Sequence, residues 1–393
     1  MKILFVVGSC LQVNSSANLC HIAYINGAVQ LGHEVDVLSM SNKGSIVDNS
    51  IKLPEVRNWF NYDPPSVNSN PITINAGAKK TASSKKISLV TLMKRTVLRF
   101  YGIYGRTASI WMRRASRFYN SESYDEIISL ATPYFSHHLA QELLRKGNVH
   151  AEKWIQIWED PWLGDLYSQS NESRQFKEEE KLLSGPDRII YSSPLTLKYQ
   201  KRAFPRFASK MEWHTLPYYY KEKDSVNDIP SQEIYGYFGD YYSFSRNLKP
   251  FMNALEASGE SGNIIGNSDL ALTSTDLIHV RPRISLAELS KVEDGTTVLV
   301  FLCNLHGGQI PGKIYQYSST NKRILFILDG TAEEKKVLYK FFSKFNRYIF
   351  CDNNSDSILN AIHAIKNSEY NGISNKEVAA FSPANTMEDI LGK

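Results

Sequence analysis

The chain has 393 residues, 42% of them hydrophobic and 12% aromatic, and a formal net charge of +5 at pH 7. This length allows two domains of about 150–200 residues each, and the composition excludes an intrinsically disordered protein. No stretch reaches the roughly 18 apolar residues that a membrane-spanning helix needs. The four cysteines include no Cys-x-x-Cys pair, which argues against a zinc site or a disulfide framework. The first apolar run is too short for a signal peptide, so we expect a cytoplasmic protein.

The first half of the chain alternates predicted strands and helices. Residues 2–7 are apolar and predict a first strand, and the next strand covers 34–38. The helix between them can be capped by Ser15 or Ser16 and should end at Gly32. The turn that begins at Gly8 lacks the Gly-x-Gly-x-x-Gly pattern of dinucleotide-binding proteins, which excludes a Rossmann dehydrogenase. Residues 42–86 have little periodicity and predict a long loop. Further strands of this half are predicted at 124–130, 154–158 and 187–192.

The excess of positive over negative charge lies in residues 77–120. This segment contains eleven Lys and Arg and no Asp or Glu, so the rest of the chain, with 34 basic and 40 acidic residues, has a net charge of −6. Apolar residues at helical intervals, among them Phe100, Tyr104 and Trp111, predict two helices here, at 87–104 and 107–118. The segment is either the solvated face of two ordinary helices or a surface for anionic lipid, because cations interleaved with aromatic residues suit a membrane interface.

We predict that this segment associates with an anionic membrane surface, at the inner face of the cell membrane. Nucleic acid is disfavoured as a partner because no nucleic-acid-binding module accompanies the charge.

Two acidic residues follow the strand predicted at 154–158. Glu159 and Asp160 precede Pro161 and Trp162. Acids at the carboxyl end of a strand stand where open α/β sheets place their chemistry. Asp160 is therefore our candidate for a catalytic acid or base, with a capping role as the alternative.

A polar stretch at 221–232 suggests a domain boundary, after which the alternation of strands and helices starts again. The first strand of this second half, 234–238, is followed by Gly239 and by a helix that runs through Ala257. A terminal helix is predicted within 378–391, started or kinked by Pro383. The remaining predicted strands are 263–266, 278–280, 297–302, 324–328 and 348–351, and helices are predicted at 286–292, 313–319, 333–344 and 355–366.

A loop of small residues in this half has the features of a phosphate site. Gly308 and Gly312 allow the backbone to come close to a ligand. Pro311 suits the first turn of a helix, because its missing N–H would have had no intrahelical partner there. The helix start would present N–H groups and the side chain of Lys313 to an anion. We therefore expect a phosphate group to bind here.

The stretch from Pro311 to Tyr317 resembles the Pro-Ser-Lys-x-x-Glu-Tyr segment of glycosyltransferase family 4, whose members have the GT-B fold. Two positions differ, because Gly312 replaces the Ser and Gln316 replaces the Glu that binds the ribose hydroxyls of a nucleotide sugar. The resemblance implies that the Gln316 amide accepts these hydrogen bonds. The neutral acceptor would bind more weakly than a carboxylate, by roughly 1 kcal/mol.

The resemblance implies further contacts to the donor. Where the family has a second Glu, this chain has Gly308, and His306 and Gln309 are expected to replace its contacts to the sugar. In such enzymes the first strand of the second domain ends in Gly, and a Lys or Arg about seven residues later holds the donor's diphosphate. Arg246 stands seven residues after Gly239.

The implied fold is α/β, with two Rossmann-like parallel-sheet domains that face each other across a cleft, as in GT-B proteins. The segment at 28–35 and the Asp-Pro-Trp sequence at 160–162 also resemble GT-B enzymes. We expect an N-terminal acceptor-side domain at 1–217, a nucleotide-sugar-binding domain at 218–374, and a C-terminal helix at 375–393 that crosses back to the first domain.

The implied function is that of a glycosyltransferase which moves a sugar from a nucleotide-sugar donor to a glycan or lipid-linked acceptor. The resemblance also implies retention at the anomeric carbon and a role in bacterial polysaccharide biosynthesis, such as that of capsule or O-antigen. Arg246 and Lys313 would neutralise the diphosphate, so neither a metal nor a cofactor is expected, in agreement with the lack of an Asp-x-Asp pair. The alternative is a degenerate GT-B protein that binds sugar nucleotide or a partner without catalysis, because Gln316 and Gly308 replace both family acids.

Overall fold

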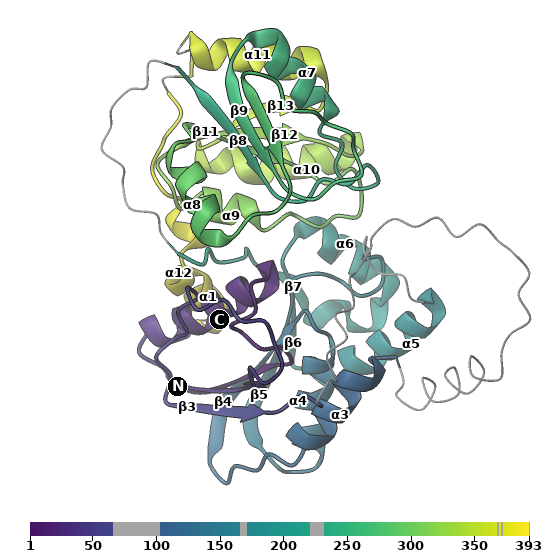
Figure 1. Ribbon diagram of the computed structural model, residues 1–393. Helices are drawn as coiled ribbons and strands as arrows, with labels where there is room; N and C mark the ends of the chain where they lie inside the picture. The colour runs from purple at the N-terminus through teal and green to yellow at the C-terminus, as the bar shows by residue number, and fades with distance from the viewer. Residues whose placement is uncertain (66–102, 166–170, 221–231, 368, 371, 393) are drawn as a thin grey trace, which may run out of the picture. The chain divides into compact units, whose positions relative to one another are not determined.

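The computed structural model describes residues 1–65, 103–165, 171–220, 232–367, 369–370 and 372–392 (Figure 1). The chain divides into two compact units. Unit 1 comprises residues 1–191 and 200–213, and unit 2 comprises residues 192–199 and 214–393. Each unit is built on a single parallel β-sheet that packs against helices.

Unit 1 contains a seven-stranded sheet with the order β3-β2-β1-β4-β5-β6-β7, in which every neighbouring pair is parallel. In its centre, Phe5 of β1 lies opposite Val37 on one side and Ile128 on the other. β1 is buried from Ile3 to Val7, as is typical of a strand covered on both faces. The strands are β1 (Lys2–Val7), β2 (Glu34–Met40), β3 (Asn58–Tyr62), β4 (Ser123–Ala131), β5 (His150–Trp158), β6 (Arg188–Tyr191) and β7 (Met211–Trp213).

The sequence did not predict the edge strands of this sheet. β3 lies inside the stretch 42–86 that was expected to be a loop, and that expectation is wrong for these five residues. The strand is short and mixed in polarity, and it is held from outside: Nε1 of Trp111 donates a hydrogen bond to the carbonyl of Tyr62 (3.0 Å). β7 has only three residues, too few for a periodicity to appear.

The helices of unit 1 follow the capping signals in the sequence. The side chain of Ser15 caps α1 by accepting a hydrogen bond from the N–H of Asn18 (3.2 Å), and Gly32 leaves the helix with a φ of 78°. Most of the helix predicted at 87–104 lies outside the described residues. The described helices are α1 (Ser16–Gln30), α3 (Gly105–Ala115), α4 (Phe135–Arg145), α5 (Glu172–Leu183), α6 (Pro194–Ala203) and the 3₁₀ helix η1 (Pro205–Lys210). The residues of α6 up to Tyr199 belong to unit 2, and the rest belong to unit 1.

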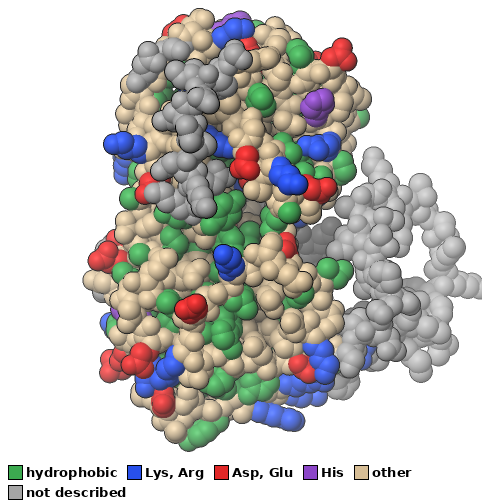
Figure 2. Space-filling model, turned by 60° about the vertical axis from the view of Figure 1, so that its left-hand side comes forward, with side chains coloured by type: hydrophobic (Ala, Val, Ile, Leu, Met, Phe, Trp, Pro, Cys, Tyr) green, Lys and Arg blue, Asp and Glu red, His purple; other side chains and the backbone are tan. Residues whose placement is uncertain are grey.

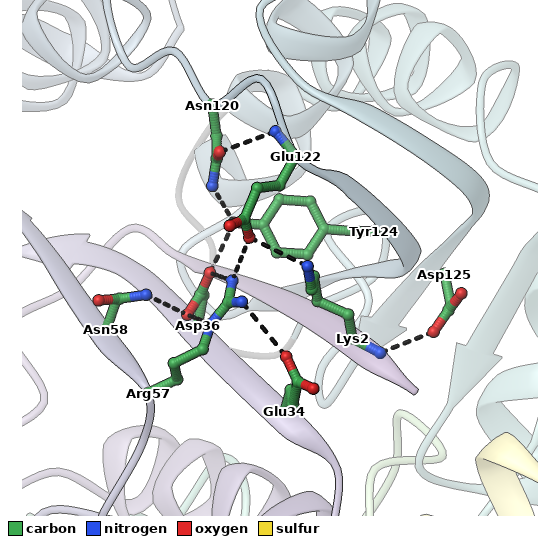
Figure 3. Close-up of polar contacts among 9 residues, drawn as sticks. All are labelled: Lys2, Glu34, Asp36, Arg57, Asn58, Asn120, Glu122, Tyr124 and Asp125. Atoms are coloured by element: carbon green, nitrogen blue, oxygen red, sulfur yellow. Dashed lines mark hydrogen bonds and ion pairs between the residues drawn. The ribbon is translucent and has the colours of Figure 1, made fainter.

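A network of polar side chains joins the amino ends of four strands in unit 1, β1 to β4 (Figure 3). The carboxylate of Asp36 in β2 is fully buried and accepts hydrogen bonds from Nε of Arg57 (2.9 Å), Nδ2 of Asn58 (3.0 Å) and the hydroxyl of Tyr124 (2.7 Å). Burial alone would raise the pKa of Asp36, but the hydrogen bonds from Arg57, Tyr124 and Asn58 outweigh it and hold that pKa below its usual value. The network therefore fixes β3 and β4 to β2. Its other members are Lys2, Glu34, Asn120, Glu122 and Asp125.

Unit 2 contains a six-stranded parallel sheet with the order β10-β9-β8-β11-β12-β13. The run predicted at 324–328 is confirmed as a buried strand of this sheet. The strands are β8 (Ile234–Phe238), β9 (Ser261–Ile265), β10 (Ile278–Arg281), β11 (Val298–Leu302), β12 (Arg323–Leu328) and β13 (Ile349–Asp352). The helices are α7 (Lys249–Ser258), α8 (Leu286–Asp294), α9 (Lys313–Tyr317), α10 (Ala332–Phe342), α11 (Ser355–Lys366) and α12 (Pro383–Leu391), with 3₁₀ turns η2 (Ser343–Phe345) and η3 (Ala379–Phe381).

α9 is shorter than predicted, whereas the terminal helix α12 begins at the proline that was expected to start or kink it. α9 has five residues instead of the seven expected, because Ser318 closes the last turn by donating from its hydroxyl to the carbonyl of Ile314 (2.6 Å). The terminal helix begins at Pro383, as proposed for a proline in a first turn, and Ser382 caps it. Its course toward the N-terminal domain stays a prediction.

Candidate functional site

The strand order of the unit 2 sheet reverses between β8 and β11, which makes this pair the topological switch point. β8 is the first strand of this sheet in the chain, β9 and β10 follow on one side, and β11 to β13 follow on the other. β8 and β11 pair in parallel, with Tyr235 opposite Val298. The loops that leave their carboxyl ends therefore start side by side, at the kind of position where open α/β sheets bind ligands.

The loop after β8 brings the candidate Arg246 back to the strand end. The N–H of Gly239 donates to the carbonyl of Ile265 (2.9 Å), which ties this loop to the end of β9. A side-chain carbon at Gly239 would lie 3.9 Å from Nη1 of Arg246. At Gly266 such a carbon would lie 1.9 Å from the carbonyl oxygen of Gly239, so the two loops can meet only because residue 266 is a glycine. The structure thus places the half-buried Arg246 beside Gly239, and the predicted contact of Arg246 with a diphosphate is untested.

The loop after β11 contacts the loop after β8. The N–H of Leu305 donates to the carbonyl of Ser245 (2.7 Å), one residue before Arg246. The loop also closes on itself, since Nδ2 of Asn304 donates to the carbonyl of Gln309 (3.1 Å). His306 is exposed at the tip of this loop, and Gln309 is buried. Sequence reasoning therefore selected two loops that the structure brings together.

Gly308 is needed for packing of the chain on itself. Its φ is 74°, and a side-chain carbon there would lie 2.8 Å from the ring of Tyr199 and 3.1 Å from Cβ of Leu195. Its carbonyl oxygen accepts hydrogen bonds from the hydroxyls of Ser193 (2.6 Å) and Thr196 (3.2 Å). The missing side chain at 308 is thus explained by the close approach of the first part of α6.

Lys313 begins α9 and already has an acidic partner. Its Nζ lies 3.1 Å from Oε1 of Glu293 at the end of α8, and 5.7 Å from the centre of the Tyr317 ring. Gly312 precedes it in helical conformation. Because α9 has only five residues, its dipole is small, and any attraction for an anion must come chiefly from the lysine charge.

The amide of Gln316 is occupied by backbone groups of the chain. Its Oε1 accepts a hydrogen bond from the N–H of Tyr219 (3.2 Å), and its Nε2 donates to the carbonyl of Tyr220 (2.9 Å) and toward the hydroxyl of Ser319 (3.3 Å). The predicted contact to a ribose is untested, and these contacts were not foreseen.

In unit 1, the two acids after β5 have different environments. Glu159 is buried, and its Oε1 lies 3.3 Å from Nε2 of His21, which is fully buried in α1. Burial, reinforced by the nearby Asp160, raises the pKa of Glu159 well above its usual value, while burial lowers the pKa of His21 to about 3. Burial thus disfavours the charged form of both groups, and the imidazole of His21 is neutral near pH 7. Asp160 is half-buried and lies at the surface of this cluster.

Aromatic side chains fix the turn that follows Asp160. The hydroxyl of Tyr134 donates to the carbonyl of Pro161 (3.0 Å), and its ring stacks on Trp162 with 4.8 Å between centroids. The position of Asp160 is thus set by a rigid turn, as a catalytic group requires. The sequence analysis singled out the two acids by their place after a strand. It missed His21, because a buried histidine inside a long helix has no local sequence pattern that marks it.

In the described part of the basic segment, arginines and Tyr119 are exposed, whereas Trp111 and Tyr104 are at least half-buried. Arg106 and Arg113, seven residues apart on α3, are exposed on one helix face, and Arg117 is exposed just after its end. Trp111 is fully buried, and Tyr104 is half-buried with its hydroxyl bonded to Glu178 (3.1 Å). The expectation that Trp111 takes part in a lipid-facing surface is therefore wrong. Phe100 lies outside the described residues.

Acidic and basic side chains are interspersed on the face drawn in Figure 2. Within the described ranges no group of three or more His, Cys, Asp or Glu is arranged to hold a metal ion. Among the same residues, no helix is long and apolar enough to cross a membrane.

No protein-family model and no curated protein matches the chain. Solved structures do match over nearly its whole length. A sucrose-phosphate synthase from Thermosynechococcus elongatus aligns with 99% of this chain and 93% of its own, at 13% identity and a TM-score of 0.54. TcCGT1, solved in complex with UDP, aligns with 99% of this chain and 97% of its own, at 10% identity and a TM-score of 0.52.

A UDP-GlcNAc 2-epimerase from Methanocaldococcus jannaschii is also similar, over 100% of this chain and 99% of its own, at 9% identity and a TM-score of 0.50. At such identities the likeness concerns the fold. Together with the two parallel sheets, it confirms the fold class expected from the sequence: the chain has the GT-B fold, with two Rossmann-like α/β domains.

Proposed function

We propose that the protein is a glycosyltransferase that moves a sugar from a nucleotide-sugar donor to a glycan or lipid-linked acceptor. One observation carries this proposal. The loop with Arg246 and the loop at 303–312 leave adjacent strands at the switch point of the unit 2 sheet and are bonded to each other. A donor diphosphate at this point would lie beside the guanidinium of Arg246.

The chemistry of sugar transfer matches these residues. The bond between the anomeric carbon and the diphosphate oxygen breaks, a bond to the acceptor oxygen forms, and the acceptor's proton passes to a base. Negative charge grows on the diphosphate during this step, and Arg246 and Lys313 are the cations that would offset it without a metal ion. Asp160, held by its rigid turn in unit 1, is the candidate for the base.

Finer parts of the proposal follow the family 4 resemblance. They are retention at the anomeric carbon, a role in bacterial polysaccharide biosynthesis, and peripheral attachment to an anionic membrane through the segment 77–120. The exposed Arg106, Arg113 and Arg117 support the last of these, because a lipid-linked acceptor is held at a membrane surface.

Two observations favour a second candidate, a protein that binds sugar nucleotide without turnover. The Gln316 amide is engaged by the backbone, and Gly308 is covered by α6, so neither position supplies the acid of the family pattern. A protein of this kind would bind a donor at the same loops and leave it intact.

A thermal-shift screen of UDP, GDP, ADP and their sugar conjugates tests both candidates. A ligand at about 100 times its dissociation constant should stabilise the protein by about 2.7 kcal/mol. Slow release of nucleoside diphosphate from a stabilising sugar conjugate supports the transferase, and binding without any release supports the second candidate. Lack of stabilisation by every nucleotide at millimolar concentration would contradict both.

A further inference from the structure

Residues 214–220, the linker that follows the last strand of unit 1, contact α9. The N–H of Tyr219 and the carbonyl of Tyr220 both bind the Gln316 side chain, at 3.2 Å and 2.9 Å. The hydroxyl of Ser319 donates a second hydrogen bond to the Tyr220 carbonyl (3.1 Å). Two consecutive linker residues are thus held by two side chains one helical turn apart.

These contacts require an amide at position 316. The linker offers one donor and one acceptor, and a glutamine side chain has one group that accepts and one that donates. An ionised glutamate could still accept from Tyr219 but would place a negative oxygen against the carbonyl of Tyr220. A glutamine therefore suits position 316 because its amide matches both the donor and the acceptor of the linker.

The same stretch also binds the C-terminal segment of the chain. The carbonyl of Ser318 accepts from the N–H of Val378 (2.9 Å), and the ring of Tyr315 makes an edge contact with Phe381, with 5.0 Å between centroids. The carbonyl of Phe381 in turn accepts from the N–H of Tyr218 (3.0 Å). The linker and the C-terminal segment are therefore bonded to each other as well as to the residues of and just after α9.

We infer that Gln316 is a positioning residue: its amide clamps the linker onto α9 and so fixes Lys313, the first residue of the same helix, at the loop after β11. The part of this inference that concerns Lys313 rests on the proposed function, because it assumes that a donor diphosphate binds there. The clamp itself depends only on the backbone contacts. A family-type glutamate at 316 should then weaken donor binding.

Hydrogen exchange at Tyr219 tests the clamp in the full-length protein. The measured quantity is the exchange rate of peptides containing Tyr219, divided by the wild-type rate at the same pH. For Gln316→Leu we expect a ratio of about ten or more at pH 7 and at pH 4, because both contacts are lost. For Gln316→Glu we expect a raised ratio at pH 7 that returns toward one at about pH 4, because a protonated carboxyl can again donate to Tyr220.

Gln232→Glu changes an exposed glutamine of unit 2 and is the matched control, which should give a ratio of one at both pH values.

Calorimetric titration with UDP tests the positioning role. Both Gln316 variants should bind UDP several-fold more weakly than wild type at pH 7, and Gln316→Glu should regain affinity in parallel with its exchange protection. An unchanged exchange ratio in Gln316→Leu would overturn the clamp, and tighter UDP binding by Gln316→Glu would overturn the positioning role. If wild type does not bind UDP, the titration uses the nucleotide that stabilises it in the thermal-shift screen. If no nucleotide stabilises it, the exchange data still decide the clamp, and the proposed function fails separately.

Discussion

Lys313 and Glu293 form an ion pair within unit 2, with 3.1 Å between Nζ and Oε1. The glutamate is almost completely buried, while the lysine is partly exposed. A donor diphosphate at the loop after β11 would therefore compete with Glu293 for the charge of Lys313.

Removal of that competitor should strengthen nucleotide binding. In Glu293→Gln the side chain keeps its shape and loses its charge, so Lys313 becomes available to an anion. We expect the dissociation constant of UDP to fall about three- to tenfold, equivalent to roughly 1 kcal/mol. Calorimetric titration measures this, with Glu256→Gln, an exposed change of the same charge on α7, as control. Equal dissociation constants in Glu293→Gln and wild type would show that Lys313 does not reach the diphosphate.

Gly308→Ala should destabilise the protein more than an alanine at another glycine with positive φ. Gly259 has a φ of 68°, and a side-chain carbon there would meet no atom within 4 Å, so Gly259→Ala reports backbone strain alone. Gly308→Ala adds the collision with Tyr199 and Leu195, which we expect to cost a further 1–3 kcal/mol or so. Thermal unfolding of the two variants gives the comparison. Similar unfolding midpoints for the two variants would mean that Tyr199 and Leu195 can move aside, and would contradict the predicted collision.

Asp36 should contribute to stability in a pH-dependent way. Asp36→Asn leaves Arg57 without its buried partner, and we expect a loss of about 3 kcal/mol at pH 7. The native pKa of Asp36 is depressed, so its contribution is complete above the unfolded value of about 3.9 and is lost as pH falls through the native pKa. The difference in unfolding free energy between wild type and variant should thus be constant from pH 7 to about 5 and shrink below about 4.

Glu34→Gln is the matched control for Asp36, since Glu34 pairs with the same arginine at 3.3 Å but is mostly exposed. It should cost less than about 1 kcal/mol. Urea unfolding at several pH values measures both variants. A cost for Glu34→Gln as large as that for Asp36→Asn would contradict the assignment of the stability to the buried carboxylate.

The arginines of α3 should support binding to anionic membranes. Replacement of Arg106, Arg113 and Arg117 by Gln removes three exposed charges, each contributing about 1 kcal/mol near an anionic surface. We expect binding to phosphatidylglycerol vesicles at low salt to weaken on the order of a hundredfold. The control replaces three exposed lysines of unit 2, Lys336, Lys340 and Lys344, by Gln. If wild type sediments equally with neutral and anionic vesicles at low salt, the membrane proposal is wrong.

The sequence predicted those parts of the protein whose signal is local. The apolar run at 324–328 and the capped start of α1 are confirmed because periodicity and capping depend on neighbouring residues. The structure places Arg246 beside Gly239, and the contact of Arg246 with a diphosphate stays a prediction.

Contacts between distant residues could not be predicted. The partners of Gln316 are backbone groups almost a hundred residues earlier in the chain, and backbone groups leave no pattern in a sequence. The pairing of His21 with Glu159 likewise depends on how α1 packs beside β5. A glycine such as Gly308 often marks a place where another group lies close to the backbone. The sequence cannot tell whether that group is a ligand or, as here, the first part of α6.

The central claim is that a nucleotide diphosphate binds in unit 2 beside Arg246, and titration of UDP into wild type and Arg246→Ala tests it most directly. Loss of a charge-assisted hydrogen bond typically costs about 1.5–3 kcal/mol, so Arg246→Ala should raise the dissociation constant of UDP at least about tenfold. Lys340→Ala, which removes an exposed charge on α10, should leave it unchanged. Equal UDP affinity in folded Arg246→Ala and wild type would contradict the account.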